Sequence, residues 1–258
     1  MACHAAPNTA FMTVAQRRLI ELAREAEERD LKAARGTVLR QYRSVNLRAA
    51  EKALTAALSQ PRAKRAQAVK GVLQLISEAS RATGTPPAEL LRVVRRAVRD
   101  RALNTRDLAV LSDPSLVFPD PGEAAADAVA RQRKEMGKYW AHESKRFKDD
   151  VAKTVREALR KGLPPEKAAD LIQERLNVSR SRAVLIAQDQ MLTAAANAER
   201  ALLKAAGAKE FQWLSLMDGR QRKSHEVLHG KVFTWRSAPE LPGQAIRCRC
   251  RAILPTET

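Results

Sequence analysis

The 258-residue sequence is poor in aromatic residues and cysteine and has no long apolar run. Trp, Tyr and Phe make up 4% of the residues, and much of the apolar remainder is Ala. This composition argues against a β-sandwich and favours helices that pack at close range. Without a run of about 18 apolar residues no membrane span is expected, and the N-terminal segment lacks the apolar region of a signal peptide.

Cysteine is too scarce for a disulfide framework. There are three cysteines, and two of them, Cys248 and Cys250, are separated by one residue. The expectation is therefore a reducing compartment. Cys3 lies near the N-terminus and is interpreted as incidental.

Acidic residues are a minority. The chain has 29 Asp and Glu against 47 Lys and Arg, which gives a formal net charge of +18. Such an excess attracts polyanions and favours contact with nucleic acid. The alternative is that Arg and Glu solvate the helix surfaces and the excess is a bias of composition.

What the chain does have is helical periodicity. Between about Phe11 and Gly207, apolar residues recur at three- and four-residue spacing. We expect a break at Gly36, because glycine weakens a helix, a boundary at Pro61, and a new helix capped by Ser179.

The organisation follows from these boundaries. Residues 1–111 form a first helical region, 112–122 a linker with three prolines and a glycine, and 123–178 a second helical region. Residues 179–258 form the last domain. The expected fold is mainly α, with long helices followed by a small C-terminal α+β unit with short strands.

Most of the histidines and cysteines lie near the C-terminus. His225, His229, Cys248 and Cys250 are soft ligands of the kind that zinc prefers. In the alternative interpretation the cysteines are buried as small apolar residues and His225 is a hydrogen-bonded packing residue. A hydrolase or nuclease would instead use His225 as a base with a cysteine or Asp218.

The segment 247–251 alternates Arg and Cys. If it is a strand, both cysteines lie on one face and the arginines on the other. Buried cysteines behind outer arginines are a structural arrangement rather than a catalytic one.

Two short segments supply a predicted surface for phosphates. They contain Arg220, Arg222 and Lys223 before His225, and Arg247, Arg249 and Arg251 around the cysteines. As neighbours they would form a basic patch that contacts nucleic acid without reading sequence. The alternative is that the arginines of the second segment pair with Glu on a neighbouring element.

Several blocks follow one another in a fixed order and spacing. They are Lys204-Ala205-Ala206-Gly207 at a helix end, Trp213 in a strand, Asp218-x-Arg220-x-Arg222-x-x-His225, Leu228-x-Gly230-x-x-Phe233, and Pro242-Gly243 before Cys248-Arg249-Cys250. Over about 179–255 this pattern resembles the head morphogenesis domain of tailed bacteriophages, the phage Mu F-like minor head proteins. The combination is specific, whereas each block alone is weak.

The resemblance also bears on the metal. Some family members have Cys at the positions of Arg222 and His225, which completes a four-thiolate zinc site. Here His225, Cys248 and Cys250 remain, and Asp218 or His229 would be the fourth ligand. Otherwise the site has no metal and Arg222 fills the space with hydrogen bonds. In both cases we expect His225 beside Cys248 and Cys250.

The resemblance implies a non-enzymatic minor capsid protein, made in the host cytoplasm and incorporated inside the virion near the portal. The implied partners are the portal protein, the major capsid protein or scaffold, packaged double-stranded DNA, and symmetric copies of the chain. Related domains are also fused to toxins, but this chain ends soon after Pro255, which favours the structural role. The alternative functions are a basic zinc-dependent nucleic-acid-binding protein and the hydrolase or nuclease.

Overall fold

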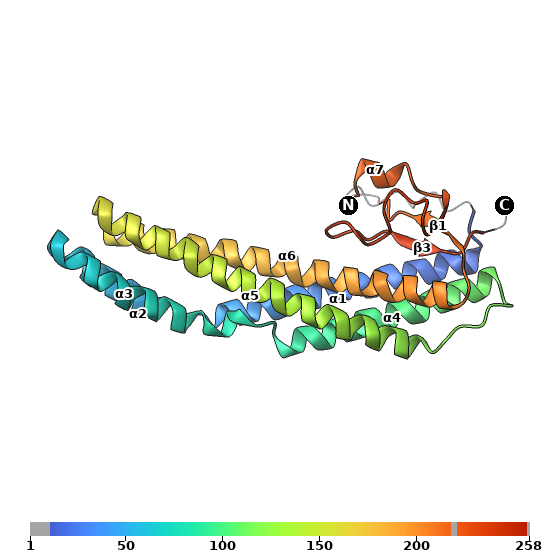
Figure 1. Cartoon of the computed structure of the whole chain (residues 1–258), viewed down its shortest axis with the longest axis horizontal. Helices are drawn as coiled ribbons and strands as arrows, with labels where there is room; N and C mark the ends of the chain where they lie inside the picture. Colours follow the sequence, from blue (N-terminus) through green and yellow to red (C-terminus); the bar gives the residue numbers. More distant parts are fainter. Residues whose placement is uncertain (1–10, 218–220, 257–258) are drawn as a thin grey trace. The chain divides into compact units, whose positions relative to one another are not determined.

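The computed structural model describes residues 11–217 and 221–256, with residues 62 and 66 described by their backbone alone. Most of the chain is helical, as predicted (Figure 1). The helices are α1 (Val14–Arg43), α2 (Arg48–Leu58), α3 (Arg62–Ala79), the 3-10 turn η1 (Arg81–Gly84), α4 (Ala88–Ser112), α5 (Pro121–Lys161), α6 (Pro165–Ala205) and the short α7 (Lys223–Glu226). No helix in this described part has the length and apolar character needed to span a bilayer.

Two of these helix boundaries lie at prolines, as predicted from the sequence. Pro61 separates α2 from α3, and α5 begins at Pro121, inside the predicted linker. Proline suits the first turn of a helix because its missing N–H would have no partner there.

Two predicted helix breaks are wrong. α1 continues through Gly36, where the flanking Ala34 and Val38 are both fully buried, so packing outweighs the helix cost of glycine. Ser179 lies inside α6 and caps nothing. Its hydroxyl is 3.0 Å from the Tyr42 hydroxyl, a buried hydrogen bond that replaces the predicted cap.

The contacts divide the chain into two units that cut across the predicted linear boundaries. Residues 35–90 and 135–187 form one unit, which holds α2, α3 and the adjoining parts of the long helices. Its core includes the fully buried Leu54, Ile76 and Ile172. The other unit, called here the site unit, holds residues 11–34, 91–134, 188–217 and 221–256.

The site unit contains a three-stranded antiparallel sheet. Its strands are β1 (Glu210–Leu214), β2 (Val232–Thr234) and β3 (Arg251–Ile253), in the order β2-β1-β3. Phe211 pairs with Phe233 across one edge of β1, and Trp213 pairs with Ala252 across the other. The small C-terminal α+β unit is therefore confirmed, with strands shorter than predicted.

The segment 245–250 is not a strand, although one was predicted there. The backbone N–H of Cys248 donates to the carbonyl of Ala245 at 2.9 Å, which closes a turn. Arg247 has a positive φ of 56°, which interrupts an extended backbone. The predicted alternation of Arg and Cys across a sheet therefore does not apply before β3.

The sheet packs on the helices through one apolar cluster. Ala109 of α4 and Leu203 of α6 meet Phe211 and Trp213 of β1 there, together with both cysteines. In the site unit α6 is buried on more than one face, because Ala196 and Glu199 are covered as well as Ala195 and Ala198. Alanine side chains let backbone segments approach this helix closely.

Candidate metal centre and the charge network around it

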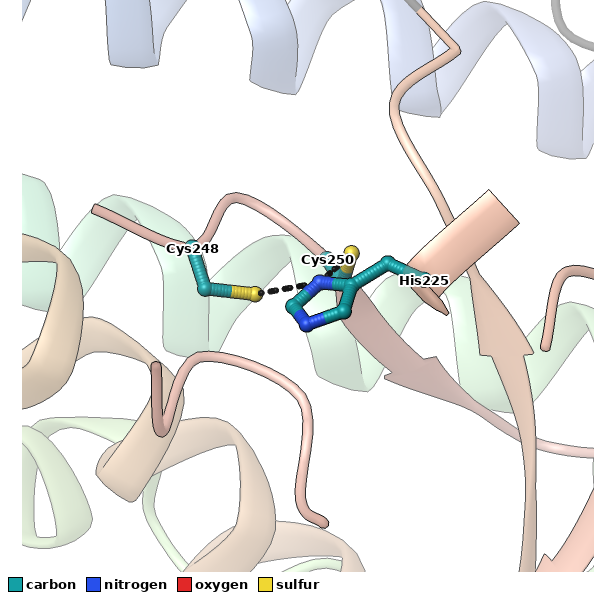
Figure 2. Close-up of side chains that lie close together, drawn as sticks. All are labelled: His225, Cys248 and Cys250. Atoms are coloured by element: carbon teal, nitrogen blue, oxygen red, sulfur yellow. Dashed lines mark hydrogen bonds between the residues drawn. The ribbon is translucent and has the colours of Figure 1, made fainter. Parts of the chain in front are cut away.

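His225, Cys248 and Cys250 lie together, as predicted. Nδ1 of His225 is 3.5 Å from Sγ of Cys248 and 3.4 Å from Sγ of Cys250. Figure 2 shows the imidazole with this nitrogen turned toward both sulfurs. All three side chains are buried, and their candidate ligand atoms lie within 4.8 Å of one another. The expectation that the two sequence blocks meet in space is confirmed.

Short local elements place the histidine. α7 begins after Arg222 and ends before Val227, so His225 and His229 do not share the face of one helix. The hydroxyl of Ser215, just after β1, donates to the His225 carbonyl at 2.6 Å. The Trp213 indole contacts the imidazole edge-on at 5.4 Å between centroids. The histidine is thus fixed to β1 through its backbone and its ring.

Gly243 places the cysteine loop. Its backbone N–H donates to Sγ of Cys248 at 3.3 Å. Its φ of +78° is in the left-handed region, and a Cβ added there would lie 2.2 Å from the Cβ of Ala196 on α6. Glycine is therefore required here both for conformation and for space.

The two thiols share one negative charge. Hydrogen bonds from the Cys250 thiol and from the Gly243 N–H lower the pKa of Cys248 to about 6. The neighbouring Cys248 and burial raise the pKa of Cys250. The directions of both shifts favour a thiolate on Cys248 over one on Cys250, and a thiolate is the form of cysteine that binds metal.

The three donors fit zinc. A tetrahedral ion about 2.1 Å from nitrogen and about 2.3 Å from sulfur places these two atoms about 3.6 Å apart. The two N···S distances of 3.5 and 3.4 Å are close to this value. His225 and both cysteines also line a cavity of about 550 Å³ that Arg222 and Arg247 border. The soft donors, their burial and a route of access agree with a zinc site, which a fourth ligand would complete.

Of the two residues predicted as a fourth ligand, His229 and Asp218, the structure describes only His229. His229 is not one of the clustered residues. Its Nδ1 accepts a hydrogen bond from the Ser215 N–H at 3.0 Å and its ring contacts Phe11. The prediction of His229 as a ligand is therefore wrong. Asp218 lies outside the described residues.

Glu240, which the sequence did not suggest, lies at the other nitrogen of the imidazole. Its Oε1 is 2.6 Å from Nε2 of His225, although the geometry is not that of an aligned hydrogen bond. A carboxylate at the distal nitrogen is the usual partner of a metal-binding histidine, because it orients the ring and fixes the tautomer.

A buried ion network joins β3 to the helices. Glu199 of α6 is completely buried and accepts a two-pronged contact from Arg101 of α4, at 2.8 and 3.1 Å. Nε of Arg251 contacts the same carboxylate at 2.9 Å, and the Ala252 N–H donates to it at 2.9 Å. Arg101 also donates to the carbonyl of Cys250 at 3.2 Å.

The neighbouring arginine charges outweigh the effect of burial on the pKa of Glu199. Burial alone would raise the pKa of Glu199, but the charges and hydrogen bonds of Arg101 and Arg251 lower it to about 2. Glu199 is therefore ionised at neutral pH and is shared by two buried guanidinium groups, of which Arg101 also pairs with Glu27 at 3.2 Å.

The predicted outer row of arginines does not form. Arg251 is buried against Glu199, while Arg249 pairs with Glu27 and, at 2.7 Å, with Glu28 of α1. The alternative in which these arginines pair with Glu on neighbouring elements describes them correctly. Both residues are thereby withdrawn from the predicted nucleic-acid surface, because their charges are neutralised inside the protein.

The remaining basic residues of the prediction are exposed. Arg222, Lys223 and Arg247 all face solvent. Arg222 donates to the carbonyl of Ile246 at 2.9 Å, which places it beside Arg247. Arg220 lies outside the described residues. The exposed basic patch, defined from here on as Arg222, Lys223 and Arg247, is smaller than predicted.

Several residues that build the site were not among the predicted ones. Glu199, Arg101, Ser215 and Glu240 carry no motif of their own. The one visible signal was Glu199, an isolated acidic residue within an Ala- and Leu-rich stretch. A charge on an otherwise apolar helix segment indicates a buried ion pair.

Fold and site together define a basic helical protein that carries a small α+β module built around a buried His-Cys-Cys cluster. The comparisons assign this module. Residues 149–253 match the family described as Phage Mu protein F like protein. The resemblance to the phage head morphogenesis family is thus confirmed over this segment, which begins well before the predicted start at Ser179.

One curated relative is an uncharacterised protein of Haemophilus influenzae. It is 29% identical over 110 residues, which cover 42% of this chain and 25% of the relative. The chain therefore spans only a minor part of that protein's length. No solved structure matches the chain.

Proposed function

We propose that this chain is a non-enzymatic minor capsid protein of a tailed bacteriophage. It is incorporated inside the head near the portal, where it contacts the portal protein, the capsid shell or scaffold, and packaged DNA. The observation that carries the proposal is the family match over residues 149–253. The net charge of +18 agrees with a location beside DNA.

The state of the cysteines agrees with a structural role. Both thiols are buried, at 5% and 3% exposure, and face His225 and Ser215. A cavity reaches the cluster, but both side chains are almost wholly covered, whereas a catalytic thiolate must contact its substrate. The packing of this cluster is that of a structural element, which holds the cysteine loop and β3 in place.

The exposed basic patch is the surface that we assign to DNA. Its three cationic side chains are exposed and come from α7 and the residues beside it. Contacts of this kind neutralise phosphates and position the protein on DNA of any sequence.

Cross-linking mass spectrometry of purified particles tests the assignment. We expect the chain in every preparation at a low, constant copy number relative to the major capsid protein. We further expect cross-links to the portal protein and DNA cross-links on peptides that contain Arg222 or Arg247. Absence from particles, together with sequence-specific DNA binding by the isolated protein, would identify a zinc-dependent regulator of the host cell instead.

We also propose that His225, Cys248 and Cys250 hold one zinc ion. The ion would cross-link α7 to the loop before β3 and would contribute to folding. Elemental analysis of protein purified without chelators should give about one zinc per chain. Cys248→Ser and Cys250→Ser should lose it.

A control variant sharpens the zinc experiment. His229→Gln should keep the metal, since His229 is not one of the clustered residues. Asp218→Ala decides whether the fourth position is filled by that carboxylate. Zinc-free, folded wild-type protein with reduced cysteines would show that the cluster is held by hydrogen bonds alone.

A further inference from the structure

The site unit has a second concave surface, which none of the cluster residues lines. It is an apolar groove of about 420 Å³ between α4 and the beginning of α5. The wall on α5 consists of small side chains, including Ala126 and Ala130, which are exposed, and the buried Val129. These residues recur at three- and four-residue spacing, so they form one continuous face of the helix.

The arrangement of α4 and α5 leaves this face of α5 accessible. The segment after α4 folds back, so that α5 starts alongside α4 and runs antiparallel to it (Figure 1). Residues 122–133 line the α5 side, which corresponds to a length of about 16 Å along the helix axis. About three turns of a further helix fit along this length, and small side chains allow it to approach closely.

Three arginines border the groove. Arg95 and Arg99 are one turn apart on α4, and Arg133 stands on α5. All three are exposed and make no ion pair with a described residue. By contrast Arg96, next to Arg95 on the same helix, is paired with the buried Asp30 at 2.5 Å. The exposed carboxylates of this part of α5, Glu123 and Asp127, are not in the groove wall.

From this combination we propose that the groove binds an acidic amphipathic helix of a partner protein. The apolar face of such a helix covers the small side chains, and its carboxylates reach the three arginines at the rim. A nucleic-acid backbone offers charge but nothing to bury against the alanines and Val129. A second copy of this chain would bring a net charge of +18 toward a basic rim. The proposal goes beyond the proposed function, since it concerns a protein partner at a different surface.

Fluorescence anisotropy with a designed peptide tests the proposal on the full-length chain. The probe is a labelled helical peptide with Leu on one face and Glu on the other, and the control peptide has Lys in place of every Glu. We expect binding of the Glu peptide to be at least about tenfold tighter than binding of the Lys peptide, because unlike charges meet at the rim. Raising the salt concentration should weaken it.

Two variants change the charged rim and the apolar wall of the groove separately. Arg95→Glu with Arg99→Glu reverses the charge of the rim, and Ala126→Trp fills the groove from its α5 wall at an exposed position. Each should weaken the Glu peptide at least about tenfold. Arg92→Glu with Arg131→Glu changes the net charge equally on the same two helices outside the groove, and it should leave the affinity within about threefold. Circular dichroism establishes that every variant is folded.

Three results would overturn the proposal. The first is failure of the Glu peptide to bind, or equal losses in the rim pair and the control pair. The second is that the Glu peptide does not bind but random duplex DNA does, and that DNA binding depends on Arg95 and Arg99. The groove would then be a nucleic-acid surface. The third is a dimer in sedimentation that Ala126→Trp abolishes, which would make the occupant a second copy. Because isolated protein is used, none of these outcomes alters the result of the particle experiment.

Discussion

Glu199→Gln is expected to lower the free energy of unfolding of the site unit by about 3–5 kcal/mol, the range found when one partner of a buried ion pair is removed. The variant keeps the shape of the side chain but removes the carboxylate that Arg101 and Arg251 share. Arg101 keeps only its second contact, with Glu27 at 3.2 Å. The β3 amide of Ala252 donates to this carboxylate. Hydrogen exchange of a peptide that covers β3 therefore reports the loss directly.

The matched control for this variant is Glu25→Gln on α1, in the same unit. Glu25 is exposed and has no ion pair with a described residue, so its replacement should change stability by less than about 0.5 kcal/mol. If Glu199→Gln were as mild as this control, the network would be a solvated arrangement and not a buried one.

The pH dependence of the same network has a definite sign. The pKa of Glu199 falls from 4.5 to about 2 in the folded protein. Its contribution to stability is therefore complete above pH 4.5 and is lost as the pH falls toward 2. By linkage this contribution amounts to roughly 3 kcal/mol. The difference in stability between wild type and Glu199→Gln should accordingly shrink over this pH window, as measured by urea unfolding at each pH.

The periodicity of the sequence was enough to predict the helices, because every long helix has an apolar side that must be covered. It was not enough to predict where they end. Gly36 and Ser179 are local signals for a break, yet both lie inside helices whose neighbours are buried. Tertiary packing outweighs a local preference of about 1 kcal/mol.

The candidate site shows a similar division. The sequence blocks that resemble the phage family predicted that His225 lies beside Cys248 and Cys250, because residues that are distant in sequence but recur in one fixed pattern are expected to be in contact. The burial of Arg251 could not be predicted in the same way. Alternation assigns a residue to one face of a strand, but it does not reveal that α4 and α6 cover this face with Glu199 between them.

Gly243→Ala is the second substitution with a large expected effect, a loss of about 2–4 kcal/mol. The left-handed φ costs an alanine about 1–2 kcal/mol, and forcing extra volume into a packed contact costs a further 1–3 kcal/mol or so. The new Cβ would lie 2.2 Å from the Cβ of Ala196. The loop that carries Cys248 must then move away from α6, which also lengthens the bond from the Gly243 N–H to that thiolate.

Two further variants separate conformation from crowding at Gly243. Gly207 has a similar φ of +88° with no atom within 4 Å of an added Cβ, so Gly207→Ala should pay the backbone cost alone. Ala196→Gly removes the opposing Cβ and, although it costs about 1 kcal/mol in its own helix, it should recover much of the loss when combined with Gly243→Ala. Urea unfolding of the four members of this cycle measures the coupling. Equal losses for the Gly243 and Gly207 variants, without coupling to Ala196, would mean that the cysteine loop does not rest on α6, and the cluster would then have to be held by its own bonds.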